Sequence, residues 1–256
     1  SSRSSEAGMK FLILSAVSSA LLLYGMVWIY GLTGSTDLVE IARAIFGSTE
    51  ATEPMGGYAI LLGVVLIIAG FGFKISSVPF HMWVPDVYEG APTPITAFLS
   101  VASKAAGFAV ILRVFYIAFP ETSVSLEWSA IFAVLAIMSM TLGNFVAIAQ
   151  KGVKRLLAYS TIAHAGYIMI GLAAIAARDP GSAAADGPTG VLFYLAGYAA
   201  TNLAAFAAVI AISNRVGSDR ITDFAGMGRR SPWLAAALAF ALISLTGVPP
   251  TVGFMV

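Results

Sequence analysis

Long apolar runs separated by short polar connections dominate the chain. A helix needs about 20 residues to cross the roughly 30 Å hydrocarbon layer of a membrane, and seven runs are near or above that length. They cover residues 11–32, 58 to about 84, 95–119, 128–149, 156–176, 191–213 and 233 to the end of the chain. The pattern predicts an all-α polytopic membrane protein with about seven transmembrane helices, forming a single membrane domain over residues 1–256.

Prolines interrupt two of these runs. The second run breaks at KISSVP, which ends at Pro79, and the last breaks at TGVPPTVG, which contains Pro249 and Pro250. Proline removes a backbone donor and clashes with the preceding helical turn, so a plain kink explains either break alone. By the order of the spans, however, the two broken helices run in opposite directions across the membrane. Such a pair in inverted halves is typical of the ion pathway of a transporter.

A shorter amphipathic segment, residues 36–46, lies between the first two runs. Asp37 and Glu40 have the spacing of a capping box, and Leu38, Ile41 and Ile45 lie on one helical face. The segment is predicted to be a short helix lying at the membrane interface. An ordinary loop helix without a membrane role is an equal alternative.

The composition supports a membrane protein and excludes several other classes. The chain is 59% hydrophobic and 11% charged, whereas soluble domains are roughly 45–50% apolar and 25% charged. With no cysteine, the chain cannot form a disulfide or hold an iron–sulfur cluster through thiolates. Two histidines offer little for a metal site, so no metal or cofactor is expected in this chain. A net charge of +1 without a basic stripe argues against a nucleic-acid partner.

The chain also has the marks of a piece of a larger subunit, incomplete at both ends. It lacks an initiator methionine, its start is polar rather than a signal peptide, and it stops at Val256 inside an apolar segment.

Basic residues beside the spans predict the orientation. Nine lie on the side that carries the N-terminus: Arg3, Lys10, Lys151, Lys154, Arg155, Arg215, Arg220, Arg229 and Arg230. Only Arg43 and Arg178 lie on the other side. By the positive-inside rule residues 1–10 are cytoplasmic.

Lys104 lies about 14 Å from the start of its run, at about 1.5 Å per residue, which makes snorkelling awkward. It shares a helical stripe of polar and small residues with Thr96, Ser100, Ser103 and Gly107. A lysine at membrane depth is costly and points to function. Because burial disfavours the charged amine, Lys104 is predicted to gain and lose a proton as a carrier. A single fixed structural partner is the alternative.

Lys74 lies near the cytoplasmic end of the first broken helix. It could snorkel to the headgroups, but the largely apolar ISSVPFHMWV follows it. We therefore expect Lys74 to be buried at the break and to act as a second protonatable carrier. Every Asp and Glu lies in a terminus, a connection or an interface, so a carboxylate partner for either lysine must come from outside this chain.

His164 is the candidate relay residue. Ser160, Tyr167 and Gly171 share its helical face, and imidazole already titrates near neutral pH. Supporting polar residues in neighbouring spans are Thr141, Asn144, Tyr194, Tyr198, Thr201 and Asn202, which could order water or simply pack. Asp86 and Glu89 could gate proton entry or cap a loop, and Trp83 and Tyr88 fit an interfacial aromatic belt.

Three segments then resemble a known family. FKISSVPFHMWVPDVYEGAPTPITAFLSVASKAAGFAVILRVF, KRLLAYSTIAHAGY and SLTGVPPTVGF are similar to the antiporter-like membrane subunits of respiratory complex I, the proton-translocating NADH:quinone oxidoreductase. VYEGAPTP and ASK most resemble the bacterial N-type subunit, the counterpart of mitochondrial subunit 2.

The resemblance implies an inverted-repeat fold of fourteen helices, of which this chain supplies about the sixth to the twelfth. It implies that Lys74 belongs to a proton half-channel, Lys104 to a central hydrophilic axis and His164 to a relay helix. The family's glutamate would lie upstream of Ser1 and a further lysine just past Val256.

The same resemblance implies a role in an enzyme complex without redox chemistry in this chain. Quinone reduction elsewhere would drive proton movement, with NADH, FMN, iron–sulfur clusters and quinone in partner subunits. The other membrane subunits of complex I and the lipid bilayer are the expected partners, and a bacterial inner membrane is the expected location, with an organellar inner membrane as the alternative. A subunit of a multi-subunit cation/proton antiporter is the alternative function, and a structural membrane scaffold a third.

Overall fold

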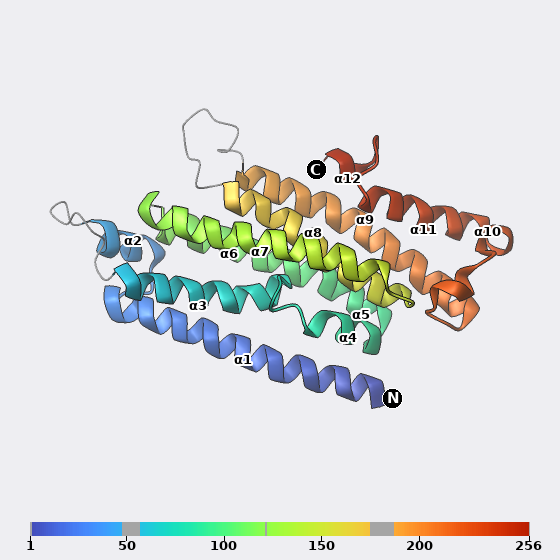
Figure 1. The fold of residues 1–256 in the computed structure, drawn as a ribbon, viewed down its shortest axis with the longest axis horizontal. Coiled ribbons are helices and arrows are strands. Elements are labelled where there is room, and N and C mark those ends of the chain that lie inside the picture. The colour runs from blue at the N-terminus through green and yellow to red at the C-terminus, as the bar shows by residue number, and fades with distance from the viewer. Residues whose placement is uncertain (1, 48–56, 121, 175–186, 256) are drawn as a thin grey trace.

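The computed structural model describes residues 2–47, 57–120, 122–174 and 187–255, which form a bundle of long helices that alternate in direction (Figure 1). The long helices are α1 (Ser2–Thr33), α3 (Gly57–Ile75), α7 (Thr122–Ile148), α8 (Val153–Ala173) and α9 (Gly187–Val216). Another is built from α5 (Thr93–Phe98), the π-helical η1 (Leu99–Ser103) and α6 (Lys104–Ala118). The shorter elements are α2 (Leu38–Phe46), α4 (Trp83–Gly90), η4 (Ile221–Phe224), α10 (Met227–Arg230), α11 (Pro232–Leu245) and α12 (Val252–Met255).

The spans lie where the apolar pattern predicts them. Within the described ranges, six helices are long and apolar enough to cross a membrane: α1, α3, the continuous α5–η1–α6, α7, α8 and α9. The seventh predicted span is the shorter apolar helix α11, which ends at the predicted break. The prediction of an all-α fold with about seven spans, two of them broken, is confirmed.

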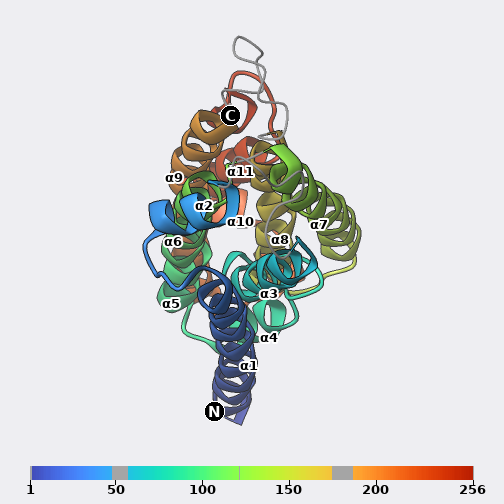
Figure 2. The ribbon, with the colours of Figure 1, turned by 90° about the vertical axis from the view of Figure 1, so that its left-hand side faces the viewer.

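Helix α8 lies at the centre of the bundle. Of the residues in its apolar window 61% are buried, against 17% for α1, which lies at the edge. In Figure 2 α8 lies between α7 on one side and α6 and α9 on the other. Side chains on α8 are therefore shielded from the surroundings by protein on several sides, which suits a polar site.

Small residues let α7 approach α8 closely. A Cβ atom added to Gly143 of α7 would lie 2.7 Å from the backbone nitrogen of Ala163, and one added to Gly166 of α8 would lie 2.9 Å from the carbonyl oxygen of Ala136. Interfaces of this kind depend on van der Waals contact between backbones, since lipid and side chains are equally apolar.

Replacing Gly143 by Ala is therefore expected to destabilise the protein by about 1–3 kcal/mol, because the new methyl group overlaps the backbone of α8. The apparent melting temperature of the full-length protein in detergent measures the effect. Gly31→Ala is the matched control, because nothing lies within 4 Å of its added Cβ. Equal melting temperatures for the two variants would contradict this close packing.

The first broken helix ends in a Schellman-type turn. Ser76 has a left-handed φ of 66°. Its N–H donates to the carbonyl of Phe73 (3.2 Å), and the N–H of Ser77 donates to the carbonyl of Gly72 (2.9 Å). This pattern satisfies carbonyls that the end of a helix leaves free. The chain then passes Pro79 and resumes as α4.

The second broken helix ends in the same way. Gly247 has a φ of 75°, and its N–H donates to the carbonyl of Ser244 (3.1 Å). The N–H of Val248 lies 3.5 Å from the carbonyl of Ile243. Pro250 stands three residues after the left-handed residue, as Pro79 does in the first break. Figure 1 shows that α3 and α11 run in opposite directions, so the two breaks are inverted copies of one local structure.

Helix α2 forms within the predicted segment 36–46. Asp37 is its N-cap, because its Oδ1 accepts the N–H groups of Val39 (2.8 Å) and Glu40 (3.1 Å). Ile41 and Ile45 are buried. The position of α2 at a membrane interface stays a prediction.

Candidate functional site

The candidate site centres on Lys104, whose side chain is only 1% exposed. Lys104 begins α6 directly after the π-helical turn η1. A π-helical turn inserts one extra residue into the helix and changes the direction of the side chains that follow, and such turns are frequent at functional sites. No pattern in the residues predicts this turn, which shifts the register of the predicted polar stripe at Lys104.

The ammonium group of Lys104 is held by uncharged partners. Nζ donates a hydrogen bond to the backbone carbonyl of Thr161 on α8. It also lies 5.4 Å from the centroid of the Tyr198 ring of α9, within the range of a cation–π interaction. No carboxylate lies within 4 Å of Nζ among the described residues. Lys104 thus has polar contacts on two helices without a partner of opposite charge in this part of the protein.

Hydroxyl and amide groups surround this lysine. The hydroxyls of Thr161 and Tyr198 are 2.9 Å apart, and either can be the donor. Asn202 of α9 donates through Nδ2 to Ser100 Oγ (2.7 Å), which in turn donates to the carbonyl of Ala97 (2.7 Å). Ser100 and Asn202, which the sequence predicts on separate helices, are therefore joined by a hydrogen bond.

Ser103, a predicted supporting residue, is half-buried. Thr201 does not join the cluster around Lys104, because its hydroxyl bonds to the carbonyls of Gly197 and Tyr198 in its own helix.

Three tyrosines surround His164, which is 6% exposed. Its Nδ1 lies 2.8 Å from the hydroxyl of Tyr194, and its ring centroid is 5.0 Å from that of Tyr198 and 5.5 Å from that of Tyr167. The hydroxyl of Tyr167 accepts from Nδ2 of Asn144 (2.9 Å). Because the Tyr198 ring touches both His164 and the Lys104 ammonium, it connects the two predicted sites.

A cavity of about 590 Å³ and another of about 610 Å³ lie at different places in the bundle. The larger one brings the His164 face of α8 against the second helix break. Ser160, His164 and Tyr167 line one wall, and Thr246 and Gly247 of the break line another. The predicted relay residue therefore lies beside one of the two broken helices.

Lys74 lies in the last turn of α3, next to the first break, but its side chain is exposed in this chain. The expectation that the following apolar residues bury it is wrong for this chain, because those residues turn away into the break and α4. Lys74 and Lys104 are thus in different environments. Pro79 is also exposed, whereas Ser76, Ser77 and Val78 around it are buried.

Two side chains hold the first break in place. Ser139 of α7 accepts the N–H of Val78 (2.9 Å), and Trp83 of α4 donates through Nε1 to the carbonyl of Phe73 (3.1 Å). Trp83 and Tyr88 are both buried, so the prediction that they form an interfacial aromatic belt is wrong. Trp83 instead connects the two parts of the broken helix.

Ser139→Ala is expected to cost about 1–3 kcal/mol of stability, because the buried N–H of Val78 loses its acceptor. Thermal unfolding of the full-length protein in detergent measures this cost. Ser129→Ala on the same helix is the control, because Ser129 donates to the carbonyl of Leu126, one turn earlier in its own helix. A loss no larger than that of the control would show that Ser139 does not hold the break.

Ion pairs fix α4 to its neighbours on the side where α1 begins. Asp86 pairs with Lys10 of α1 (2.7 Å), and Arg155 of α8 pairs with Glu89 (2.9 Å) and with Asp86 (3.4 Å). Single exposed ion pairs contribute little, but a network of several charges contributes more. The two carboxylates that sequence reasoning assigned to gating or loop capping therefore join three helices.

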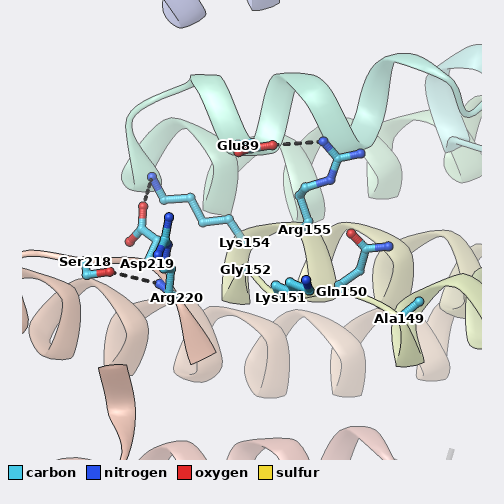
Figure 3. A pocket seen from close by; sticks show the side chains of 10 residues that line it. All are labelled: Glu89, Ala149, Gln150, Lys151, Gly152, Lys154, Arg155, Ser218, Asp219 and Arg220. Atoms are coloured by element: carbon cyan, nitrogen blue, oxygen red, sulfur yellow. Dashed lines mark hydrogen bonds and ion pairs between the residues drawn. The ribbon is translucent and has the colours of Figure 1, made fainter. Parts of the chain in front are cut away.

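The smaller cavity lies next to these ion pairs (Figure 3). Lys154 of α8 pairs with Asp219 (3.0 Å), and the N–H of Val153 donates to the carbonyl of the same aspartate (2.9 Å). These contacts hold the beginning of α8 against the connection that follows α9.

Sequence reasoning missed Thr161, Ser139 and the bridging role of Trp83. Thr161 contributes a backbone carbonyl, which every residue possesses, so no pattern could single it out. Ser139 lies in an apolar span without polar neighbours at helical spacing, and only the position of the break reveals its use.

Two oppositely directed broken helices beside a central helix, with a buried lysine in contact with that helix, define an antiporter-like membrane protein. The chain belongs to the family described as NADH:quinone oxidoreductase/Mrp antiporter, TM, whose sequence model matches residues 1–256. It is a multi-span membrane protein.

Known proteins resemble it over nearly its whole length. NADH-quinone oxidoreductase subunit N from Dehalococcoides mccartyi is 49% identical over 253 residues, which cover 98% of this chain and 52% of that protein. A chain of respiratory complex I from Thermus thermophilus, solved with bound aureothin, is 36% identical with a TM-score of 0.74, covering 99% of this chain and 51% of that one. A chain of the Mrp complex from Dietzia sp. DQ12-45-1b is 25% identical with a TM-score of 0.82, covering 98% and 43%.

The chain spans about half the length of the curated relatives it matches.

Proposed function

We propose that this chain is part of a proton-translocating membrane subunit of an NADH:quinone oxidoreductase. The observation that carries the proposal is Lys104, a buried amine at the centre of the bundle whose partners are a carbonyl and an aromatic ring. A fixed counter-charge would hold the amine permanently protonated, whereas uncharged partners allow it to exchange a proton. The relatives named subunit N support the choice of complex.

In this proposal Lys104 is the central carrier, His164 is a relay toward the second break, and Lys74 is a carrier at the first break. Ser100, Ser160 and Tyr167 line the polar route, and Pro79, Pro249 and Pro250 belong to the breaks. An exposed Lys74 fits a carrier whose partner lies in sequence outside this chain. Redox chemistry with NADH, FMN, iron–sulfur clusters and quinone would take place in partner subunits and drive the proton movement.

The proposed location is a bacterial inner membrane, with the beginning of α1 on the cytoplasmic side. The excess of lysine and arginine on that side supports this orientation. A subunit of a multi-subunit cation/proton antiporter is the second candidate, and the structural likeness to the Mrp complex favours it. Purification of the native complex separates the two: redox partners support the first candidate, and antiporter subunits alone support the second.

Replacing Lys104 tests the carrier role in inverted membrane vesicles that hold the assembled complex. Lys104→Ala removes the amine, and Lys104→Arg keeps a charge that cannot release its proton. Both variants are expected to lower NADH-driven proton uptake by about a hundredfold or more, as for loss of a proton-transfer group. The amount of assembled complex, read from a native gel, is the control. If the subunit is only a structural scaffold, proton uptake is equal with Lys, Arg or Ala at position 104. That result would remove Lys104 from the pathway.

Lys74→Ala is expected to lower the number of protons taken up per NADH oxidised. Arg43→Ala is the control, because Arg43 is an exposed cation whose ion pair among the described residues is with Glu40 of the same short helix (2.6 Å). Unchanged proton stoichiometry in Lys74→Ala would show that Lys74 is a snorkelling surface lysine.

A further inference from the structure

The aromatic side chain of Tyr88 is unusual among the buried polar groups of the bundle. Tyr88 lies on α4, beyond the first break, and is 0% exposed. Its ring lies edge-on to Trp83 and to Phe206, each with centroids 6.3 Å away. Its hydroxyl has no hydrogen-bond partner among the described residues. A buried hydroxyl without a partner costs about 1–3 kcal/mol, so phenylalanine would be the more stable choice for packing alone.

The surroundings of this hydroxyl are the polar groups at Lys104. The Tyr88 hydroxyl lies near the side chains of Thr161 and Tyr198 but outside hydrogen-bond geometry with either of them. Those two residues already form a hydroxyl pair at 2.9 Å in which either oxygen can donate. The carbonyl that accepts from Lys104 belongs to Thr161 itself, and the ammonium lies over the ring of Tyr198, so both residues of the hydroxyl pair contact Lys104.

The direction of the Thr161–Tyr198 hydrogen bond decides whether the Tyr88 hydroxyl can donate to Thr161 or accept from it. When Thr161 donates to Tyr198, its oxygen has a lone pair free to accept from the Tyr88 hydroxyl. When Tyr198 donates to Thr161, the Thr161 proton is free to be given to Tyr88. A small shift of the Tyr88 side chain therefore completes a chain of three hydroxyls in either direction.

We propose that Tyr88 is a proton-relay residue that connects the segment after the first break with Lys104 through Thr161 and Tyr198. Each hydroxyl accepts a proton on an oxygen lone pair as it gives up its own proton, so one proton passes and no hydroxyl changes its charge. Neutral Lys104 takes up the proton at Nζ and becomes an ammonium. The unpartnered hydroxyl in this structure is the open position of the relay. This proposal rests on the proposed function of the chain.

The location of Tyr88 also gives the relay an entrance. Asp86 lies two residues before Tyr88 on α4, and Glu89 directly follows Tyr88. Both carboxylates lie at the surface where α1 begins, where Asp86 pairs with Lys10 and Glu89 pairs with Arg155. The same short helix thus carries ionised groups at the surface and a buried hydroxyl next to the Lys104 cluster.

Tyr88→Phe tests the proposal, because it removes only the hydroxyl and keeps the packing with Trp83 and Phe206. In inverted vesicles with the assembled complex, NADH-driven proton uptake is expected to fall by about a hundredfold, the lower end of the range for loss of a proton-transfer group. The melting temperature is expected to stay level or rise, because an unpartnered buried hydroxyl is removed. Tyr24→Phe is the matched control, since Tyr24 is exposed on α1, and it should pump as the unmodified protein does.

Thr161→Val supplies a second, independent variant, because it removes the hydroxyl and keeps the carbonyl that binds Lys104. It is expected to lower proton uptake to the same extent as Tyr88→Phe, and the double variant should be no worse than either single one, because all three interrupt one path. If the fold-loss of proton uptake in the double variant equals the product of the two single losses, the two hydroxyls act independently, and that result would overturn the relay.

The outcomes also separate this proposal from the proposed function. Normal pumping by Tyr88→Phe together with loss of pumping by Lys104→Ala would overturn the relay and leave the carrier intact. Normal pumping by Lys104→Ala would overturn the proposed function itself.

Discussion

The structure depends on the burial of an amine inside an apolar helix bundle. An ion taken out of water loses several kcal/mol of solvation unless protein groups replace the water. For Lys104 the replacements are one carbonyl of α8 and one ring of α9. The carbonyl acts through its dipole and the ring through its quadrupole, and neither carries a full charge, so they accommodate the ammonium without fixing it. The amine is thereby placed where three helices meet, and the packing of those helices sets its surroundings.

The rest of the fold keeps these groups in register. Helix α8 lies at the centre of the bundle and supplies the carbonyl of Thr161 to Lys104. Gly143 lets α7 pack closely against the backbone of α8. The π-helical turn directs Lys104 toward that carbonyl, and the Asn202–Ser100 hydrogen bond ties the turn to α9. Small residues, an irregular turn and a polar pair together place the lysine against its partners.

The sequence predicts the parts of this arrangement that depend on local pattern. Run lengths locate the spans, prolines locate the two breaks, and helical spacing places Lys104 on a buried stripe. The missed features depend on contacts between distant segments. A backbone carbonyl such as that of Thr161 carries no signature, and LSVAS looks like any helical segment although it forms a π-helical turn. The exposure of Lys74 likewise depends on which helices cover α3, and helical period does not encode that.

The two helix breaks share their backbone geometry but differ in their ionisable side chains. Both end a helix with a left-handed residue and the same pair of backbone hydrogen bonds. Two residues before the left-handed position, however, the first break has Lys74 and the second has Leu245. At the second break the titratable group stands across a cavity, as His164 on α8. A broken helix therefore supplies free backbone groups and an opening between helices, while the ionisable side chain can come from the broken helix or from the helix that faces it. An inverted repeat keeps the free backbone groups and the opening, because both depend on the backbone. The position of the ionisable side chain varies between the two breaks, because it depends on the local sequence.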